Sequence, residues 1–182
     1  MRSDMTVARR PGVLAAALGF CLMVAGPALA DGGGNGGSDK TTCPRGEVYD
    51  ARTMSCVKQG SSVLPEKALT EYAYALAKAW RFDEALDVLN LLENPNTPEA
   101  LNYRGYATRK MGRVDEGIAY YRKSIALAPR YAQVREYLGE AYVIKHDIAR
   151  AKAQLRAIKT ICGTECEEYK HLAGAIVGDW HS

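Results

Sequence analysis

The sequence predicts an all-α protein: a solenoid of three helical hairpins and a C-terminal capping helix, preceded by a signal peptide and a small cysteine-bounded segment. Three observations favour this fold class. Apolar residues recur at three- and four-residue steps through most of the chain after residue 65, a pattern typical of amphipathic helices. A short phrase around a turn returns twice at nearly constant spacing. The composition, 47% hydrophobic and 25% charged, is that of an ordinary globular protein.

Residues 1–30 are predicted to be a signal peptide. Two arginines precede an apolar run at 13–25, and an Ala-x-Ala cleavage site ends at Ala30. The run is too short for a membrane-spanning helix, which needs about 20 apolar residues. Cys21 follows a bulky phenylalanine and not the small residue that precedes a lipid-bearing cysteine. We therefore expect cleavage after Ala30 and a periplasmic or secreted protein.

The expected mature chain is nearly neutral, with 21 basic and 20 acidic residues and no run of Lys or Arg. Binding to nucleic acid or to anionic lipid depends on neutralising phosphate charge with clustered cations. The sequence therefore predicts that the mature protein binds neither nucleic acid nor membranes.

Residues 31–42 are rich in Gly and polar residues and are predicted to be a flexible linker. The segment 43–60 is predicted to be a loop or short hairpin closed by Cys43 and Cys56, and a small binding knuckle is the alternative. Whether this segment packs on the helices stays open. An even number of cysteines in an oxidising compartment favours disulfides, and the second close pair is Cys162 with Cys166.

Apolar stripes at 69–76 and 85–92 flank a turn at 79–82 and predict one helical hairpin. The phrase at this turn, residues 80–85, is echoed at 112–117 and at 146–151. It ends each time on a small residue, and these are spaced by 32 and 34 residues: Ala85, Gly117 and Ala151. Another small residue lies twelve positions earlier in each unit: Ala73, Gly105 and Gly139. We expect the two helices of each hairpin to cross closely at these small residues.

This pattern resembles the tetratricopeptide-repeat family, whose 34-residue unit is a helix, a turn and a helix. The residues that carry the resemblance are Gly112, Tyr121 and Pro129 in the second unit and Leu138, Gly139, Tyr142 and Ala151 in the third. The implied repeats are 65–97, 98–131 and 132–163. Trp80 departs from the pattern at the usual turn glycine, and Arg104 stands at a usually apolar position. With its signal and its C-P-x-G-x-x-Y-D opening, the chain also resembles secreted repeat proteins of alphaproteobacterial type.

Residues 164–178 are predicted to form the capping helix, because a stack of hairpins leaves its final face uncovered. Gly163 suits a helix C-terminus that needs positive φ. Thr164 and Glu167 have the spacing of a capping box. A bond between Cys162 and Cys166 would fix the corner between the last two helices.

The sequence contains no constellation that indicates catalysis or a cofactor, so we expect no enzyme and no cofactor. The strongest metal hypothesis joins Cys162, Cys166 and His171 around zinc, but it lacks a fourth donor and the usual cysteine spacing. Thiol–disulfide exchange by Cys162 and Cys166 is a second alternative. A self-associating structural module is a third, and the oligomeric state stays open.

The resemblance to tetratricopeptide repeats implies a non-catalytic scaffold that holds a protein or peptide partner in a concave groove. The family pattern places nine residues of this chain in that groove: Thr70, Tyr74, Lys78, Asn102, Tyr103, Tyr106, Arg109, Glu136 and Glu140. In the family's carboxylate clamp, basic residues occupy the positions of Glu136 and Glu140. We therefore expect a partner segment that is neutral or positively charged near these two residues.

Overall fold

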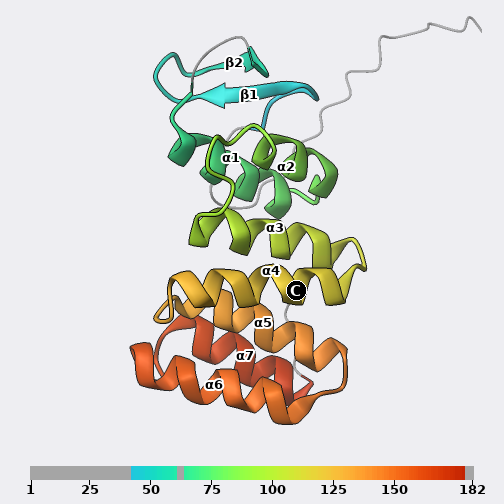
Figure 1. Ribbon diagram of the computed structural model, residues 1–182, viewed down its shortest axis with the longest axis vertical. Helices are drawn as coiled ribbons and strands as arrows, with labels where there is room; N and C mark the ends of the chain where they lie inside the picture. The colour runs from blue at the N-terminus through green and yellow to red at the C-terminus, as the bar shows by residue number, and fades with distance from the viewer. Residues whose placement is uncertain (1–41, 61–63, 179–182) are drawn as a thin grey trace, which may run out of the picture. The chain divides into compact units, whose positions relative to one another are not determined.

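The computed structural model describes residues 42–60 and 64–178. The predicted signal peptide, and the predicted linker apart from residue 42, lie outside the described residues. In the described residues the chain forms one antiparallel β-hairpin and then seven helices (Figure 1). The elements are β1 (Glu47–Asp50), β2 (Ser55–Lys58), α1 (Glu66–Lys78), α2 (Phe82–Leu89), α3 (Pro98–Lys110), α4 (Val114–Leu127), α5 (Ala132–Ile144), α6 (Ile148–Cys162) and α7 (Glu167–Val177). The predicted all-α class is confirmed.

The helices pack as hairpins that follow one another in chain order. Helix α1 pairs with α2, α3 with α4, and α5 with α6. The first helices of the hairpins also contact one another, because α1 packs on α3 and α3 on α5, and α7 continues this inner row by packing on α5 (Figure 1). No helix in the described part of the chain combines the length and apolar character that a membrane crossing requires.

The three hairpin turns share one backbone geometry. Trp80, Gly112 and His146 occupy equivalent positions and have φ values of +63°, +85° and +59°. In each turn the next amide donates to a helix carbonyl four residues before the positive-φ residue, at 2.9, 3.2 and 2.8 Å. A left-handed conformation costs a non-glycine residue about 1–2 kcal/mol. Trp80 therefore replaces the turn glycine without changing the turn.

The two helices of the second hairpin cross at glycines, as predicted. An added Cβ at Gly105 would lie 2.6 Å from the ring of Tyr121 and 3.1 Å from the carbonyl oxygen of Gly117. The equivalent alanines of the first and third hairpins, Ala85 and Ala151, are almost completely buried. The glycines of the second hairpin are thus required by the close approach of α3 and α4. In the third hairpin the prediction is wrong for Gly139, because an added Cβ there would meet Leu172 of α7 and not α6.

Replacing Gly105 by alanine is expected to lower the free energy of unfolding by about 1–3 kcal/mol, because the fully buried Tyr121 ring must move to make room. The substitution would otherwise favour a helix by about 1 kcal/mol. Urea denaturation monitored by circular dichroism measures the difference. A variant as stable as the original protein would show that the second hairpin is more loosely packed than described.

Arg104 stands where the repeat pattern usually has an apolar residue, and its side chain binds the C-terminal end of α2. Its guanidinium donates to the carbonyl oxygen of Leu89 at 3.0 Å and to Oδ1 of Asn90 at 2.8 Å. Leu89 is the last residue of α2, so its carbonyl has no partner within its own helix. The departure from the repeat pattern thus joins the first hairpin to α3.

The cysteine-bounded segment packs on the first hairpin. A disulfide joins Cys43 to Cys56, and β1 contacts α1. The amide of Cys43 donates to the hydroxyl oxygen of Tyr72 at 2.8 Å, and Arg81 donates to the carbonyl oxygen of Cys43 at 2.7 Å. The question left open by the sequence is therefore answered, since this segment covers part of α1.

The capping helix covers the third hairpin, but its start differs from the prediction. Gly163 has the predicted positive φ, at +84°. The predicted capping box is wrong, because α7 begins only at Glu167, with Cys166 as its N-terminal flanking residue and no side-chain cap. Thr164 therefore lies outside the first turn, and its hydroxyl contacts Glu165 instead.

Candidate functional site

A hollow of about 520 Å³ opens between the inner helices α1, α3, α5 and α7. Its walls come from the C-terminal halves of α1 and α3, the N-terminal part of α5 and most of the length of α7. The lining residues are Tyr74, Lys78, Trp80, Tyr106, Lys110, Gln133, Glu136, Tyr137, Glu140, Glu167, Glu168, Lys170, His171, Gly174 and Ala175. A site built from four separate elements exists only when the hairpins are stacked.

Tyrosines from three helices form one wall of the hollow. The hydroxyls of Tyr74 and Tyr137 lie 3.3 Å apart and share a hydrogen bond between α1 and α5. The rings of Tyr106 and Tyr137 lie 4.9 Å apart, and Tyr74 stacks on Tyr103 at 4.5 Å. These hydrogen-bond and ring contacts restrict the side-chain rotamers of the tyrosines. The aromatic wall is therefore formed before any partner arrives.

Trp80 and Lys110 stand at the rim beside this wall. Trp80 is 70% exposed, although tryptophan has the bulkiest side chain of all amino acids. The ammonium of Lys110 lies 5.4 Å from the Trp80 ring and 5.7 Å from the Tyr106 ring, within the range of cation–π attraction. A large exposed aromatic beside a hollow is typical of a contact that a partner covers.

Arg109 supports the floor and is almost entirely enclosed. Its guanidinium donates to Oε2 of Glu140 at 2.6 Å and to the hydroxyl of Tyr121 at 3.2 Å. The Arg109 side chain is 2% exposed and that of Glu140 is 16% exposed. The negative charge of Glu140 is therefore largely offset within the protein.

Glu136 is a buried carboxyl group in the wall formed by α5. Its Oε1 lies 3.0 Å from Nδ1 of His171, on α7. The pKa of Glu136 is raised to about 8, chiefly by burial and also by the neighbouring Glu140 and Glu168, while Arg109 and Lys78 act in the opposite direction. Glu136 is thus largely protonated near neutral pH, and its proton can be shared with the imidazole.

Five of the nine predicted groove residues line the hollow: Tyr74, Lys78, Tyr106, Glu136 and Glu140. The other four support it or lie elsewhere. Thr70 is buried and donates to the carbonyl of Glu66. Tyr103 stacks behind Tyr74, and Arg109 lies beneath the floor.

Asn102 also turns away from the hollow. Its amide donates to the hydroxyl of Tyr131 at 3.2 Å and to Oε1 of Gln133 at 3.0 Å. Asn102 therefore ties the second hairpin to the third and does not face a ligand.

The prediction missed all six lining residues of α7 and four residues on the other walls of the hollow. The missed residues are Trp80, Lys110, Gln133, Tyr137, Glu167, Glu168, Lys170, His171, Gly174 and Ala175. The exposed Trp80 at a turn position could have been found from its large size and its departure from the glycine pattern. The residues of α7 could not, because they reach the site only through the docking of α7 on α5.

The zinc set considered from the sequence is not brought together. Cys162 and Cys166 form a disulfide, and His171 faces Glu136. Among the described residues, the cysteine and acidic side chains close enough to share a metal ion are Cys162, Cys166 and Glu168. With both sulfur atoms bonded to each other, this corner joins α6 to α7 as a covalent link.

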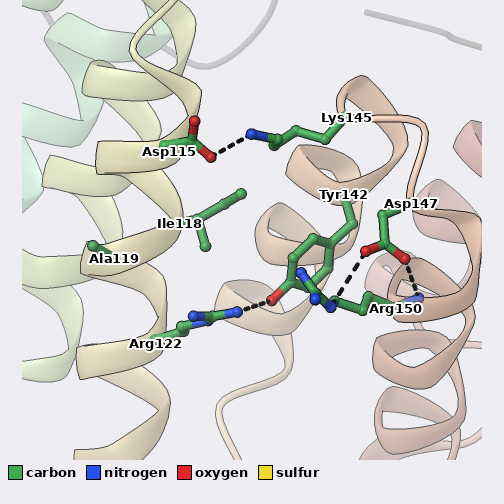
Figure 2. Close-up of a pocket in the computed structure, with 8 residues that line it drawn as sticks. All are labelled: Asp115, Ile118, Ala119, Arg122, Tyr142, Lys145, Asp147 and Arg150. Atoms are coloured by element: carbon green, nitrogen blue, oxygen red, sulfur yellow. Dashed lines mark hydrogen bonds and ion pairs between the residues drawn. The ribbon is translucent and has the colours of Figure 1, made fainter.

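A second pocket, of about 310 Å³, lies where α4 meets α5 and α6. Figure 2 shows that its charged side chains contact one another. Lys145 pairs with Asp115 at 2.6 Å, and Arg150 pairs with Asp147 at 3.3 Å. Arg122 donates to the hydroxyl of Tyr142 at 3.0 Å. The pocket is therefore a polar junction between the second and third hairpins.

No protein-family model matches the chain. A stretch of 86 residues, 47% of the chain, is 33% identical to anaphase-promoting complex subunit 7 of Homo sapiens, and the Mus musculus protein matches to the same extent. The matched stretch covers 15% of the length of these two proteins.

Proposed function

We propose that this protein is a non-catalytic scaffold that holds a segment of a partner protein in the hollow between α1, α3, α5 and α7. The observation that carries the proposal is the preformed aromatic wall with the exposed Trp80 at its rim. Such rigid aromatic surfaces give large contact area at low entropic cost. The distant similarity to a subunit of a multiprotein complex supports an interaction role.

We further propose that the protein acts in the periplasm or outside the cell. The predicted signal peptide is the main reason for this location. The two disulfides support it, because such bonds persist in oxidising compartments. The partner is then a protein that is itself exported or exposed at the cell surface.

Replacing Trp80 by glycine is expected to weaken partner capture at least about tenfold while leaving the fold intact. The rim loses its exposed ring, but glycine accepts the φ of +63° without strain, so the melting temperature should hold or rise. Affinity capture from an extract of the native host, followed by quantitative mass spectrometry, measures the change. Calorimetry of the purified variant measures its stability.

The matched control is Leu127→Ala, which removes an apolar side chain that is 57% exposed at the end of α4, away from the hollow. Capture by this variant should equal capture by the original protein. Partners retained equally by both variants would remove the hollow from consideration as the binding site.

A further inference from the structure

We propose that the bond between Cys162 and Cys166 is an exchangeable disulfide, and that its opening by a dithiol releases residues 167–171 from the wall of the hollow. Three features support this: the exposure of the bond, the way in which α7 is anchored, and the residues that line the hollow. The opening itself does not depend on a partner, whereas its effect on partner capture rests on the proposed function.

The two disulfides differ in their access to solvent. Cys43 is 1% exposed, and its amide and carbonyl groups are both hydrogen-bonded to side chains of the first hairpin. Cys162 is exposed, and Cys166 is half-buried. Exchange requires that a thiolate reach one of the two sulfur atoms, and exposed disulfides are accordingly the labile ones. Cys162 therefore offers the most accessible point of attack.

The two disulfides also close rings of different length. Cys43 and Cys56 are 13 residues apart in the sequence, whereas Cys162 and Cys166 are 4 residues apart. In the chain-entropy model a shorter ring restricts the open chain less, so closing it stabilises the protein less. We therefore expect the Cys162–Cys166 bond to open at dithiol concentrations that leave the Cys43–Cys56 bond closed.

The exposed disulfide holds a part of α7 that has no buried anchor of its own. The buried residues of α7 are Leu172 and Ala175, so residues 167–171 contribute none. Cys166 precedes the first turn, and no side chain caps the helix there. The covalent bond to Cys162 is thus the strongest link between the first turns of α7 and the rest of the protein.

Exposed polar contacts remain when the bond opens. Lys170 pairs with Glu165 at 3.1 Å, but both side chains are more than half exposed. His171, whose side chain is 61% exposed, lies 3.0 Å from Oε1 of Glu136. Exposed ion pairs contribute little to stability, because solvent screens them. Residues 167–171 are therefore expected to fray, while the remainder of the helix stays docked.

Fraying of this stretch removes part of the candidate site. Four of the residues that line the hollow belong to it: Glu167, Glu168, Lys170 and His171. The aromatic wall comes from α1, α3 and α5 and does not depend on the bond. The opened protein thus keeps the aromatic wall and loses most of the wall formed by α7.

The opening consumes one dithiol. A thiolate of the dithiol attacks Sγ of Cys162, the S–S bond breaks, and Cys166 leaves as a thiolate that takes a proton from solvent. The second thiol of the donor loses its proton and attacks the mixed disulfide, so that Cys162 leaves in the same way and is protonated. The donor departs as a disulfide. Two electrons have then passed to the cysteine pair, and the two protons that the donor lost are balanced by the two that the pair gained.

The first experiment titrates the purified protein with dithiothreitol, alkylates the free thiols and assigns them to cysteines by mass spectrometry. The Cys162–Cys166 bond should open at a dithiothreitol concentration at least about tenfold below that required by the Cys43–Cys56 bond. Two bonds that open together, or a Cys162–Cys166 bond that opens only when the protein unfolds, would overturn the exchangeable disulfide.

Hydrogen exchange followed by mass spectrometry measures the release of α7. When only the Cys162–Cys166 bond is open, residues 167–171 should exchange at least about tenfold faster, and α3 and α5 should not change. The variant Cys162→Ser/Cys166→Ser should show the same increase without dithiothreitol. The matched control Cys43→Ser/Cys56→Ser should leave the exchange of α7 unchanged. Unaltered exchange of residues 167–171 in the opened protein would overturn their release.

The effect on capture is measured with peptides selected from a random dodecapeptide library, displayed on phage, on the oxidised protein. Peptides that lose binding to Trp80→Gly should bind Cys162→Ser/Cys166→Ser at least about fivefold more weakly than the original protein. Equal binding to both would overturn the control of the hollow by this bond and leave the scaffold function standing. A selection that yields no peptide dependent on Trp80 would overturn the proposed function, whereas the titration and the hydrogen exchange decide the opening and the release by themselves.

Discussion

Replacing Arg109 by methionine is expected to lower the free energy of unfolding by about 3 kcal/mol. The guanidinium is buried between α3, α4 and α5, where it donates to Tyr121 and to Glu140. Its removal leaves the Glu140 carboxylate without its partner and the Tyr121 hydroxyl without its hydrogen bond. The value lies at the lower end of the range for buried pairs, because Glu140 retains some contact with solvent.

Chemical denaturation of the Arg109→Met variant measures this change. The matched control is Arg113→Met, which breaks an exposed pair with Glu116 in the same hairpin and should lower stability by less than about 1 kcal/mol. The double variant Arg109→Met/Glu140→Leu should recover most of the loss, since no unpaired charge remains. Equal effects of Arg109→Met and Arg113→Met would show that the buried network contributes no more than a surface pair.

The repeat architecture was predictable because it depends on spacing. Small residues twelve positions apart in each unit predict a close helix crossing, and the tight approach of Gly105 to Tyr121 in the second hairpin agrees with it. In the third unit the element closest to Gly139 is α7 and not α6. Helix periodicity and the uncovered final face predicted α7 in the same way, and Leu172 of α7 is fully buried, where it would contact a Cβ added at Gly139. Local signals and their repetition are enough for these elements.

Contacts between distant segments could not be predicted in this way. Whether the cysteine-bounded segment docks depends on the hydroxyl of Tyr72, 29 residues after Cys43, and on the guanidinium of Arg81. Nothing in the sequence around Tyr72 or Arg81 indicates that these side chains bind Cys43. The start of α7 was also placed too early, since the helix begins at Glu167 and Thr164 lies before it.

The candidate site was predictable in part. The repeat pattern correctly indicates which helix faces inward, and Tyr74, Tyr106 and Glu136 lie at the hollow. It cannot distinguish a polar residue that faces a ligand from one that binds the next hairpin. Asn102 and Arg109 belong to the second group, because Gln133 and Glu140 of α5 happen to accept their hydrogen bonds.

The pKa of Glu136 also predicts how stability depends on pH. The folded protein holds this proton up to about pH 8, whereas the unfolded chain releases it near the ordinary value of 4.5. Between these two values the folded state binds one more proton than the unfolded state, so the free energy of unfolding contributed by Glu136 is complete below about pH 4.5 and falls as the pH rises to about 8. With about 1.4 kcal/mol for each pKa unit, the loss is on the order of 5 kcal/mol.

Glu136→Gln is therefore expected to flatten the pH profile of stability. Glutamine keeps the shape and the hydrogen-bonding capacity of the protonated acid but cannot ionise, so the variant should be more stable than the original protein above about pH 8 and should lose that advantage as the pH falls toward 5. Urea denaturation at a series of pH values measures both curves, and Glu93→Gln is the control whose profile should run parallel to that of the original protein. Parallel curves for Glu136→Gln would show that this carboxyl is already ionised in the folded protein.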